Sequence, residues 1–316
     1  MPPRRVAVIA NPRSGSHDDD AVREGVGAVF DASGVAWSWP AGGDVAARLR
    51  EALATRPDVL VAAGGDGTVN AVANALARAG DGAAPALGIV PLGTFNFVAR
   101  RYGIPQDDPA AAAAAIAGGR TQCIGAGEVN GHLFLNNCCF GLYTSLIDAR
   151  ERHKRRFGRY RIVAFASALA TLLQSHGRQS VLLRLLDTDG EQTASRRLRT
   201  SLVFIGANPL QLGEVGESFA AEVEQGALGF VAVRSVDAWR LLKFAWGALQ
   251  ANAAELQEVE AIVTRYAEAI VRRRRLRCVV DGELLPLPTP LRLRWRDDVL
   301  RLCVPAAAAD EESAAV

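Results

Sequence analysis

The chain has 316 residues, of which 49% are hydrophobic and 22% are charged, and its mean hydropathy is +0.09. This is the composition of a globular protein that is long enough for two domains, each with its own core. The formal net charge of +2 excludes a strongly basic nucleic-acid-binding protein on overall charge. The apolar runs are too short for a membrane-spanning helix or a signal peptide. We therefore expect a cytoplasmic protein.

The first 120 residues alternate short apolar strands with helices. Strands are expected at 5–10, 35–39, 58–63 and 86–93, and helices at about 18–32, 43–55, 68–79 and 108–117. Such alternation predicts βα units and a parallel sheet that is covered on both faces.

After about residue 121 the pattern becomes rich in strands. It starts with a hairpin whose Asn-Gly turn is Asn130–Gly131. Strand-like runs follow at 180–192, 198–208, 226–235, 272–285 and 290–304, and helices are expected at about 158–175 and 237–250. Residues 307–316 are small and acidic, which predicts a disordered tail.

The cysteines are odd in number and show no CxxC spacing; they are Cys123, Cys138, Cys139, Cys278 and Cys303. Cys138 and Cys139 are adjacent in an apolar stretch. We therefore expect buried, reduced thiols and neither disulfides nor a zinc site.

Three turn sequences that suit phosphate groups follow three of the expected strands: "NPRSG" (11–15), "GGDGTVN" (64–70) and "PLGTFN" (91–96). In open α/β sheets, ligands bind at the carboxyl ends of the strands, so these loops are expected to meet at one crevice. The chain contains no GxxxxGK[ST] sequence, which excludes a P-loop enzyme.

The second of these loops contains a carboxylate, Asp66, among glycines. Glycines let the backbone approach a phosphate closely, and the amides of the helix that follows would point at it. A carboxylate there would repel a nucleotide phosphate unless a divalent cation lay between them. Asp66 therefore indicates a Mg²⁺-nucleotide, with the alternative that Asp66 only caps the helix.

These motifs resemble those of the soluble diacylglycerol kinase and sphingosine kinase-like lipid kinases. The matching pieces occur in the order and spacing of that family and are "NPRSG", "GGDGTVNAVANAL", "PLGTFNFVARRYGIP", "VNGHLFLNNCCFGL" and "VVDGELL". The resemblance implies a Rossmann-like α/β nucleotide domain, residues 1–121 completed by about 295–306. It also implies a C-terminal β-sandwich lipid-substrate domain, residues 122–294, with the active site in the cleft.

The resemblance also implies roles for individual residues. Glu283, Asp281 and Asp66 would be catalytic; Asp66 would also meet the Mg²⁺, through water. The nucleotide would be bound by Asn11, Gly64, Gly65, Gly67, Thr68, Asn70 and Thr94. Glu283 or Asp281 would take the proton from the lipid hydroxyl, since alternate strand positions share one face. The alternative for "DGE" is a simple hairpin turn.

Three departures from the family pattern concern metal binding. Phe97 and Gly125 stand where the family often carries acidic or polar residues near the loop aspartate. Gln225 stands where an acidic residue helps to hold a structural metal. These departures leave Asp66, Asp281 and Glu283 in place, but they reduce the expected metal ligands.

Two basic stretches could meet anionic surfaces. Seven Arg and Lys residues between Arg150 and Arg161 precede an apolar stretch, which favours peripheral membrane contact over a solvated loop. The run 271–277, "VRRRRLR", leads into "DGE" and is expected to line the cleft. Because neither stretch has regularly interleaved aromatic residues, no nucleic acid partner is expected.

The sequence therefore predicts an ATP- and Mg²⁺-dependent lipid kinase acting on a hydroxyl of a diacylglycerol-like or sphingoid lipid. The first alternative is a weakly active or inactive relative that senses nucleotide or lipid. The second is a small-molecule kinase of the NAD kinase type. The identity of the lipid and a homodimeric state are left open.

Overall fold

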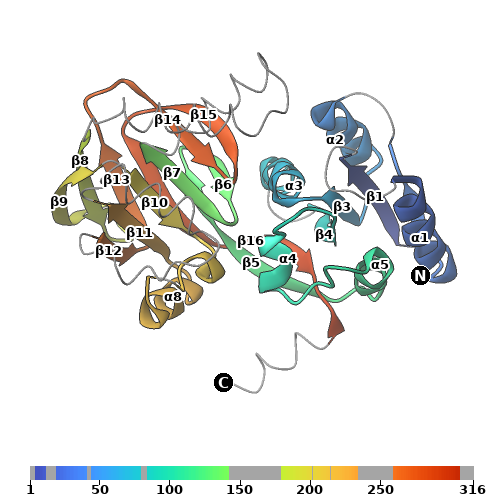
Figure 1. The fold of residues 1–316 in the computed structure, drawn as a ribbon. Helices are drawn as coiled ribbons and strands as arrows, with labels where there is room; N and C mark the ends of the chain where they lie inside the picture. The colour runs from blue at the N-terminus through green and yellow to red at the C-terminus, as the bar shows by residue number, and fades with distance from the viewer. Residues whose placement is uncertain are drawn as a thin grey trace, which may run out of the picture. The chain divides into compact units, whose positions relative to one another are not determined.

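The computed structural model describes residues 4–11, 19–40, 44–79, 84–141, 179–200, 202–213, 215–233 and 259–306. The chain folds into two compact units (Figure 1). The first unit is Met1–Ala126 with Arg296–Val316, and the second is Gly127–Trp295. Strands β5 (Thr121–Val129) and β16 (Leu291–Cys303) each contribute residues to both units.

A parallel sheet forms the centre of the first unit. Its order is β2 (Ala36–Ser38), β1 (Arg5–Ala10), β3 (Val59–Gly64) and β4 (Ala86–Pro91), and every pairing is parallel. The C-terminal end of β16 pairs in parallel with β4 through Leu302 and Leu87. Strands β3 and β4 are buried along their whole length. The structure thus confirms the parallel sheet expected from the apolar runs.

Helices cover both faces of this sheet. They are α1 (Asp19–Ala32), α2 (Val45–Ala54), α3 (Asp66–Arg78), α4 (Phe97–Arg101) and α5 (Pro109–Ala117). Helix α1 packs against α5, and α2 packs against α3. Local capping fixes two of the helix starts: Asp44 accepts a hydrogen bond from the amide of Ala47, and Asp108 accepts two, from Ala110 and Ala111.

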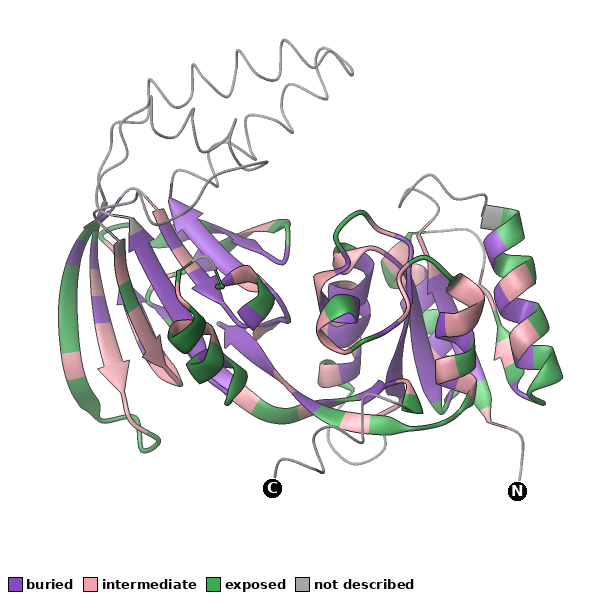
Figure 2. Cartoon of the chain, turned by 60° about the horizontal axis from the view of Figure 1, so that its bottom comes forward, coloured by how far each residue is buried: buried purple, intermediate pink, exposed green. Residues whose placement is uncertain are grey.

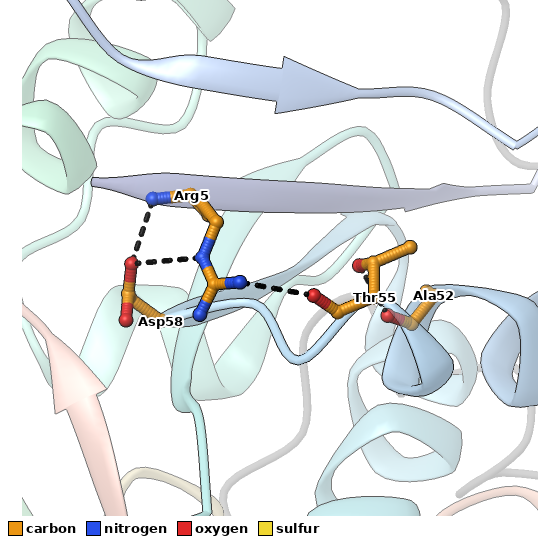
Figure 3. A network of polar contacts seen from close by, with 4 residues as sticks. All are labelled: Arg5, Ala52, Thr55 and Asp58. Carbon is orange, nitrogen blue, oxygen red and sulfur yellow. Dashed lines mark hydrogen bonds and ion pairs between the residues drawn. The ribbon is translucent and has the colours of Figure 1, made fainter. Parts of the chain in front are cut away.

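The amino-terminal edge of the sheet is held by a small polar network (Figure 3). The Arg5 amide donates to Asp58 Oδ2 at 2.8 Å, and the Arg5 side chain donates to the Thr55 carbonyl at 3.3 Å. The Thr55 hydroxyl in turn donates to the Ala52 carbonyl at 2.7 Å. These bonds join the start of β1 to the α2–β3 connection. Because Arg5 and Asp58 are about half exposed, their ion pair adds little to stability and mainly fixes geometry.

The second unit is a β-sandwich. Its six-stranded antiparallel sheet runs β12 (Val259–Thr264), β11 (Leu228–Val233), β10 (Leu202–Gly206), β7 (Asn137–Gly141), β14 (Arg275–Val280) and β15 (Glu283–Pro288). The facing strands are the start of β16, β13 (Tyr266–Ile270), β8 (Gln179–Leu186) and β9 (Gln192–Thr200). A hairpin of β5 and β6 (His132–Phe134) adds to β16.

Apolar side chains from both sheets fill the space between them. Phe140, Ile205 and Phe230 come from the six-stranded sheet, and Leu183 and Leu291 come from the facing strands. Figure 2 shows most strands of both units buried, with the exposed positions concentrated on the helices, turns and edge strands. This arrangement confirms the expected α/β fold with a separate, β-rich second part.

Four of the five cysteines are buried as free thiols, as expected; Cys123 is the exposed one. A hydrogen bond with Cys278 raises the pKa of Cys138, and burial raises it further. Burial also raises the pKa of Cys139 to about 12. These thiols therefore stay protonated at neutral pH and behave as small apolar core residues.

Several boundaries differ from the sequence-based expectation. Helix α3 begins at Asp66, two residues early, and α4 was not expected. The run 198–208 divides into the end of β9 and the whole of β10, which belong to different sheets. Strands β12 and β13 were missed, as were α8 (Glu217–Glu224) and the short 3₁₀ helix η1 (Pro209–Gln211). The helices expected at 158–175 and 237–250, the basic stretch Arg150–Arg161 and the tail 307–316 lie outside the described residues.

Candidate functional site

The three expected phosphate loops start at one edge of the parallel sheet. Because β1, β3 and β4 are adjacent and parallel, their carboxyl ends coincide. The Asn11 amide donates to the Ala63 carbonyl at 3.1 Å, and the Leu92 amide donates to the Gly64 carbonyl at 3.0 Å. The chain leaving β1 and the chain leaving β4 therefore both run beside the end of β3. Of the first loop, only Asn11 lies within the described residues.

Two glycine backbones touch where the second and third loops meet. A Cβ atom on Gly93 would lie 2.5 Å from the Gly65 Cα and 2.7 Å from Asn96 Oδ1. A Cβ atom on Gly65 would lie 3.2 Å from the Gly93 Cα. No side chain fits at Gly93 without moving the backbone opposite it. The two glycines therefore allow the loops after β3 and β4 to lie in direct contact.

Asn96 fastens the third loop and was not predicted from the sequence. Its Oδ1 accepts a hydrogen bond from the Gly93 amide at 3.0 Å, and its Nδ2 donates to the Gly93 carbonyl at 3.0 Å. Asn96 is buried and has a φ of +48°, a conformation that asparagine tolerates better than most residues. This asparagine holds the loop in which Thr94 is exposed.

The second loop leads into the N-terminus of α3. Gly65 is the N-cap residue, and its carbonyl accepts bonds from the amides of Thr68 and Val69. A Cβ atom on Gly67 would meet nothing within 4 Å, so the first turn of the helix is open for close approach of a ligand. An open helix N-terminus favours an anion through its amides and its dipole.

Thr68 and Asn70 lie beneath this loop. Their exposed fractions are 4% and 8%. The side-chain amide of Asn74 donates to both the carbonyl and Oδ1 of Asn70, at 3.1 and 2.9 Å. This burial gives Thr68 and Asn70 a supporting position under the loop backbone.

Asp66 joins the second loop to the third. It occupies the first turn of α3, and the N-cap residue is Gly65, so the alternative that Asp66 caps this helix is wrong. Its Oδ1 accepts a hydrogen bond from the Val98 amide, 3.4 Å away, at the start of α4. Phe97 precedes Val98 and stacks on Phe95, with ring centroids 5.6 Å apart. No group of three or more His, Cys, Asp or Glu side chains suited to a metal occurs within the described ranges.

The "DGE" sequence forms a hairpin turn in the second unit. Val280 pairs with Glu283, so Asp281 and Gly282 are the two turn residues, with φ values of +44° and +88°. The argument that alternate strand positions place Asp281 and Glu283 on one face is therefore wrong, because Asp281 lies in the turn and Glu283 begins the next strand. A tight turn needs positive φ at both positions, which suits Asp-Gly.

Asp281 is a buried carboxylate that holds the hairpin turn in place. It accepts hydrogen bonds from the amides of Leu135, Asn136 and Asn137 at 2.7, 3.0 and 2.8 Å. The Asp281 amide donates to the Asn137 carbonyl at 2.9 Å. These bonds balance the cost of burying the charge and tie the turn to the β6–β7 connection. Glu283, at the start of β15, is exposed.

A polar network beside this turn escaped the sequence analysis. Asn136 and Asn208 are buried, and the Asn208 side-chain amide donates to Asn136 Oδ1 at 2.9 Å. The Asn137 side-chain amide donates to Gln211 Oε1 at 2.8 Å. The only signal in the sequence was the Asn136–Asn137 pair before an apolar strand. The network joins the start of β7 to the β10–η1 connection and to η1.

The sequence-predicted residues thus fall into two groups. Those of the first unit, from Asn11 to Thr94, share one edge of the parallel sheet, whereas Asp281 and Glu283 belong to the second unit. The basic run 271–277 is not beside "DGE". It precedes β14 and occupies the start of that strand, so its arginines at 272–275 lie about 20 Å along β14 from the Asp281 turn.

Comparison with known proteins gives the same picture for the first unit. Residues 5–129 match the family described as diacylglycerol kinase catalytic domain. This part of the chain is therefore similar to the catalytic domain of diacylglycerol kinases. A diacylglycerol kinase of Bacillus subtilis is 37% identical over 159 residues, 49% of this chain and 52% of that protein. The resemblance inferred from the motifs is thereby confirmed.

Two further relatives extend the comparison. A Pseudomonas aeruginosa protein named "Probable lipid kinase YegS-like" is 52% identical over 94 residues, 30% of each chain. The crystal structure of a diacylglycerol kinase from Bacillus anthracis superposes with a TM-score of 0.66 at 19% identity, covering 98% of this chain and 99% of that one. The chain spans about half the length of the Bacillus subtilis relative, and the low identity to the solved structure shows the fold alone.

No helix within the described ranges combines the length and the apolar character that crossing a bilayer requires.

The contact between Gly65 and Gly93 predicts a matched pair of stability effects. Gly93→Ala places a methyl group 2.5 Å from the Gly65 Cα and should lower the free energy of unfolding by about 1–3 kcal/mol. Gly67→Ala adds a methyl group to open space in a helix and should leave stability unchanged or raise it. Chemical denaturation of both variants measures this. Equal stability of the two variants would contradict the proposed contact.

Asp281 and Glu283 should differ in the same assay. Asp281→Ala leaves three backbone amides, two of them in buried bonds, without their acceptor and should cost about 3 kcal/mol or more. Glu283→Gln changes an exposed side chain and should shift stability by about 0.5 kcal/mol or less. If Asp281→Ala unfolded at the wild-type denaturant concentration, the anchoring role of Asp281 would be refuted.

Proposed function

We propose that this protein is a lipid kinase that transfers the γ-phosphoryl group of ATP to a hydroxyl of a diacylglycerol-like or sphingoid lipid. The observation that carries the proposal is the pair of glycine loops in contact at the carboxyl edge of the sheet, with Asp66 in the first turn of α3. The match of residues 5–129 to the diacylglycerol kinase catalytic domain supports it.

The phosphates of the nucleotide are bound by the backbone in this proposal. Gly65 and Gly67 let the phosphate oxygens approach the first amides of α3, where the helix dipole favours negative charge. Thr94 is exposed on the neighbouring loop and can donate its hydroxyl to the same phosphates. Asn11, which directly follows β1, also contacts the phosphates in this proposal.

Asp66 is the residue that would hold Mg²⁺. One carboxylate together with phosphate oxygens is a usual way in which proteins bind this ion, so Asp66, in the first turn of α3, fits it. When bound, Mg²⁺ neutralises the charge that develops on the phosphate oxygens. The hydrogen bond from the Val98 amide orients the Asp66 carboxylate on the loop.

Glu283 accepts the proton of the attacking hydroxyl in this proposal. The lipid oxygen forms a bond to the γ-phosphorus as the bond to the β–γ bridging oxygen breaks, and ADP leaves. Glu283 is exposed at the start of β15, while Asp281 holds the turn that presents it. Asp281 is thus assigned as a positioning residue and Glu283 as the proton acceptor.

A nucleotide- or lipid-sensing role is the second candidate. The observation that favours it is the aromatic pair Phe95 and Phe97 next to Val98, whose amide binds Asp66, in a described region that holds no group of three or more acidic, His or Cys side chains suited to a metal. Weak metal binding would slow phosphoryl transfer and leave nucleotide binding intact.

Phosphorylation of a lipid panel tests these proposals. Protein with Mg²⁺ and labelled ATP is offered diacylglycerol, monoacylglycerol and a sphingoid base, with NAD as the probe for an NAD kinase-type activity. We expect transfer to a lipid and a loss of at least 10²-fold in Asp66→Asn and Glu283→Gln. Nucleotide binding without transfer to any acceptor would refute the kinase proposal and favour the sensing role. Unchanged turnover in both variants would show that Asp66 and Glu283 are not catalytic residues.

We further propose a cytoplasmic protein that contacts the membrane peripherally through the basic stretch Arg150–Arg161, which lies outside the described residues. Replacing Arg152, Lys154, Arg155 and Arg156 by Gln should weaken sedimentation with anionic vesicles on the order of 10-fold or more, because each basic residue favours such a surface. Unreduced sedimentation would refute this contact.

A further inference from the structure

Arg48 is a charged residue on the face of α2 that packs against the parallel sheet. Its exposed fraction is 8%, and the other buried residues of this helix are Leu49 and Ala52. The remaining charged residues of α2, Arg50 and Glu51, are exposed. The core-facing side of a surface helix is normally apolar, and arginine is almost never fully buried unless it is paired. The burial of Arg48 therefore indicates a specific role.

The Arg48 guanidinium holds the peptide group that leads out of β1. Its Nη1 atom donates to the carbonyl of Ala10, the last residue of that strand. The other polar group of the same peptide, the Asn11 amide, donates to the Ala63 carbonyl of β3 at 3.1 Å. Both polar groups of the Ala10–Asn11 peptide are therefore bonded, one to α2 and one to β3. Arg48 thus helps to fix Asn11, the residue at which the first phosphate loop begins.

The charge of Arg48 has no counter-charge in the described part of the chain. No ion pair that involves Arg48 occurs within the described ranges. Its Nε atom is buried and has no hydrogen-bond partner, and it is the one buried side-chain nitrogen or oxygen of the described residues in that state. Burial of an ion costs more than a single hydrogen bond to a carbonyl returns. An anion that binds nearby would offset this cost.

The packing of the helices places Arg48 near the expected phosphate site. Helices α2 and α3 contact each other and both contact β1, so they lie on one face of the sheet. Arg48 bonds to the last residue of β1, so its guanidinium lies at the carboxyl edge of the sheet. Helix α3 also begins at this edge, directly after β3. The edge therefore combines the open first turn of α3 with a buried cation on the neighbouring helix.

A role in holding the Ala10 carbonyl alone does not explain the charge. A neutral side-chain amide can donate to a carbonyl without burial of an ion. A guanidinium carries its charge at every physiological pH, so the cost of its burial is always present. An arginine at this position is better explained by a bound anion.

We propose that Arg48 is a positioning residue of the phosphate site, which fixes Asn11 and whose buried charge stabilises the phosphates of a bound nucleotide. The inference rests on the proposed function, because the anion is taken to be the phosphate chain of Mg²⁺-ATP. A charge in a poorly solvated site acts over several ångströms, so the guanidinium does not have to touch the phosphates. Arg48 would thus add a favourable charge to the backbone amides of α3.

Calorimetric titration of the full chain with Mg²⁺-ATP, in the absence of lipid, tests this role. Arg48→Met removes the charge and the hydrogen bond, Arg48→Gln removes the charge and keeps an amide donor, and Arg48→Lys keeps the charge. The matched control is Arg50→Gln, which removes an exposed charge from the same helix. Chemical denaturation without ligand measures the stability of each variant.

Arg48→Met and Arg48→Gln should bind Mg²⁺-ATP on the order of 10-fold or more weakly than the wild type, because both lose the charge. Arg48→Lys should bind within about threefold of the wild type, and Arg50→Gln within about twofold. Without ligand, Arg48→Met should unfold at a denaturant concentration close to that of the wild type. The reason is that removal of a buried charge offsets the loss of the bond to Ala10.

Four results would overturn the role of Arg48. They are wild-type affinity in Arg48→Gln, an affinity of Arg48→Lys as low as that of Arg48→Met, failure of Arg48→Met to fold without ligand, and absence of Mg²⁺-ATP binding by the wild type. Failure to fold would show that the charge is already compensated within the protein. If Mg²⁺-ATP binding depends on the charge at residue 48 but no lipid is phosphorylated, the kinase proposal fails and the role of Arg48 stands. Lipid phosphorylation with unchanged affinity in Arg48→Gln would have the opposite meaning.

Discussion

The contact between the Gly65 and Gly93 backbones is the constraint on which the candidate phosphate site depends. It lets the loops after β3 and β4 lie against each other, so that the start of α3 and the exposed Thr94 share one edge of the sheet. Asn96 maintains the contact by bonding both polar groups of Gly93. There is no room for a Cβ atom at Gly93. The backbone conformation of the two loops, rather than a charged side chain, therefore determines the geometry of the site.

Asp281 and Asp66, two carboxylates that the sequence predicted to be catalytic, differ in burial and in hydrogen bonding. Asp281 is buried and accepts three backbone amides, so its charge is used inside the second unit to hold the turn. Asp66 lies on a half-exposed loop and accepts a longer bond from Val98. A carboxylate whose oxygens are taken up by amides is a poor metal ligand or base, whereas one presented on an open loop can meet a cation. This difference supports an anchoring role for Asp281 and agrees with the proposal that Asp66, rather than Asp281, meets a cation.

The features of the fold that depend on neighbouring residues could be predicted from the sequence. The buried runs of β3 and β4, the helices between them and the Asn130–Gly131 turn follow from periodicity and turn chemistry. The role of Asp281 could not be predicted, because its partners at 135–137 are distant in the sequence and bond through backbone amides. The division between β9 and β10 was missed for a related reason: β9 ends at Thr200 and β10 begins at Leu202 in the other sheet, and the sequence offers no turn signal between them.

A single loop carboxylate changes how a metal would be bound. With two or three acidic side chains a protein can hold Mg²⁺ before nucleotide arrives, since the carboxylates replace water in the shell of the ion. Within the described residues no group of three or more acidic, His or Cys side chains is suited to a metal, and Phe97 begins α4 next to Val98, whose amide binds Asp66. Affinity for the ion would then come mainly from the nucleotide phosphates, and the ion would enter as part of Mg²⁺-ATP.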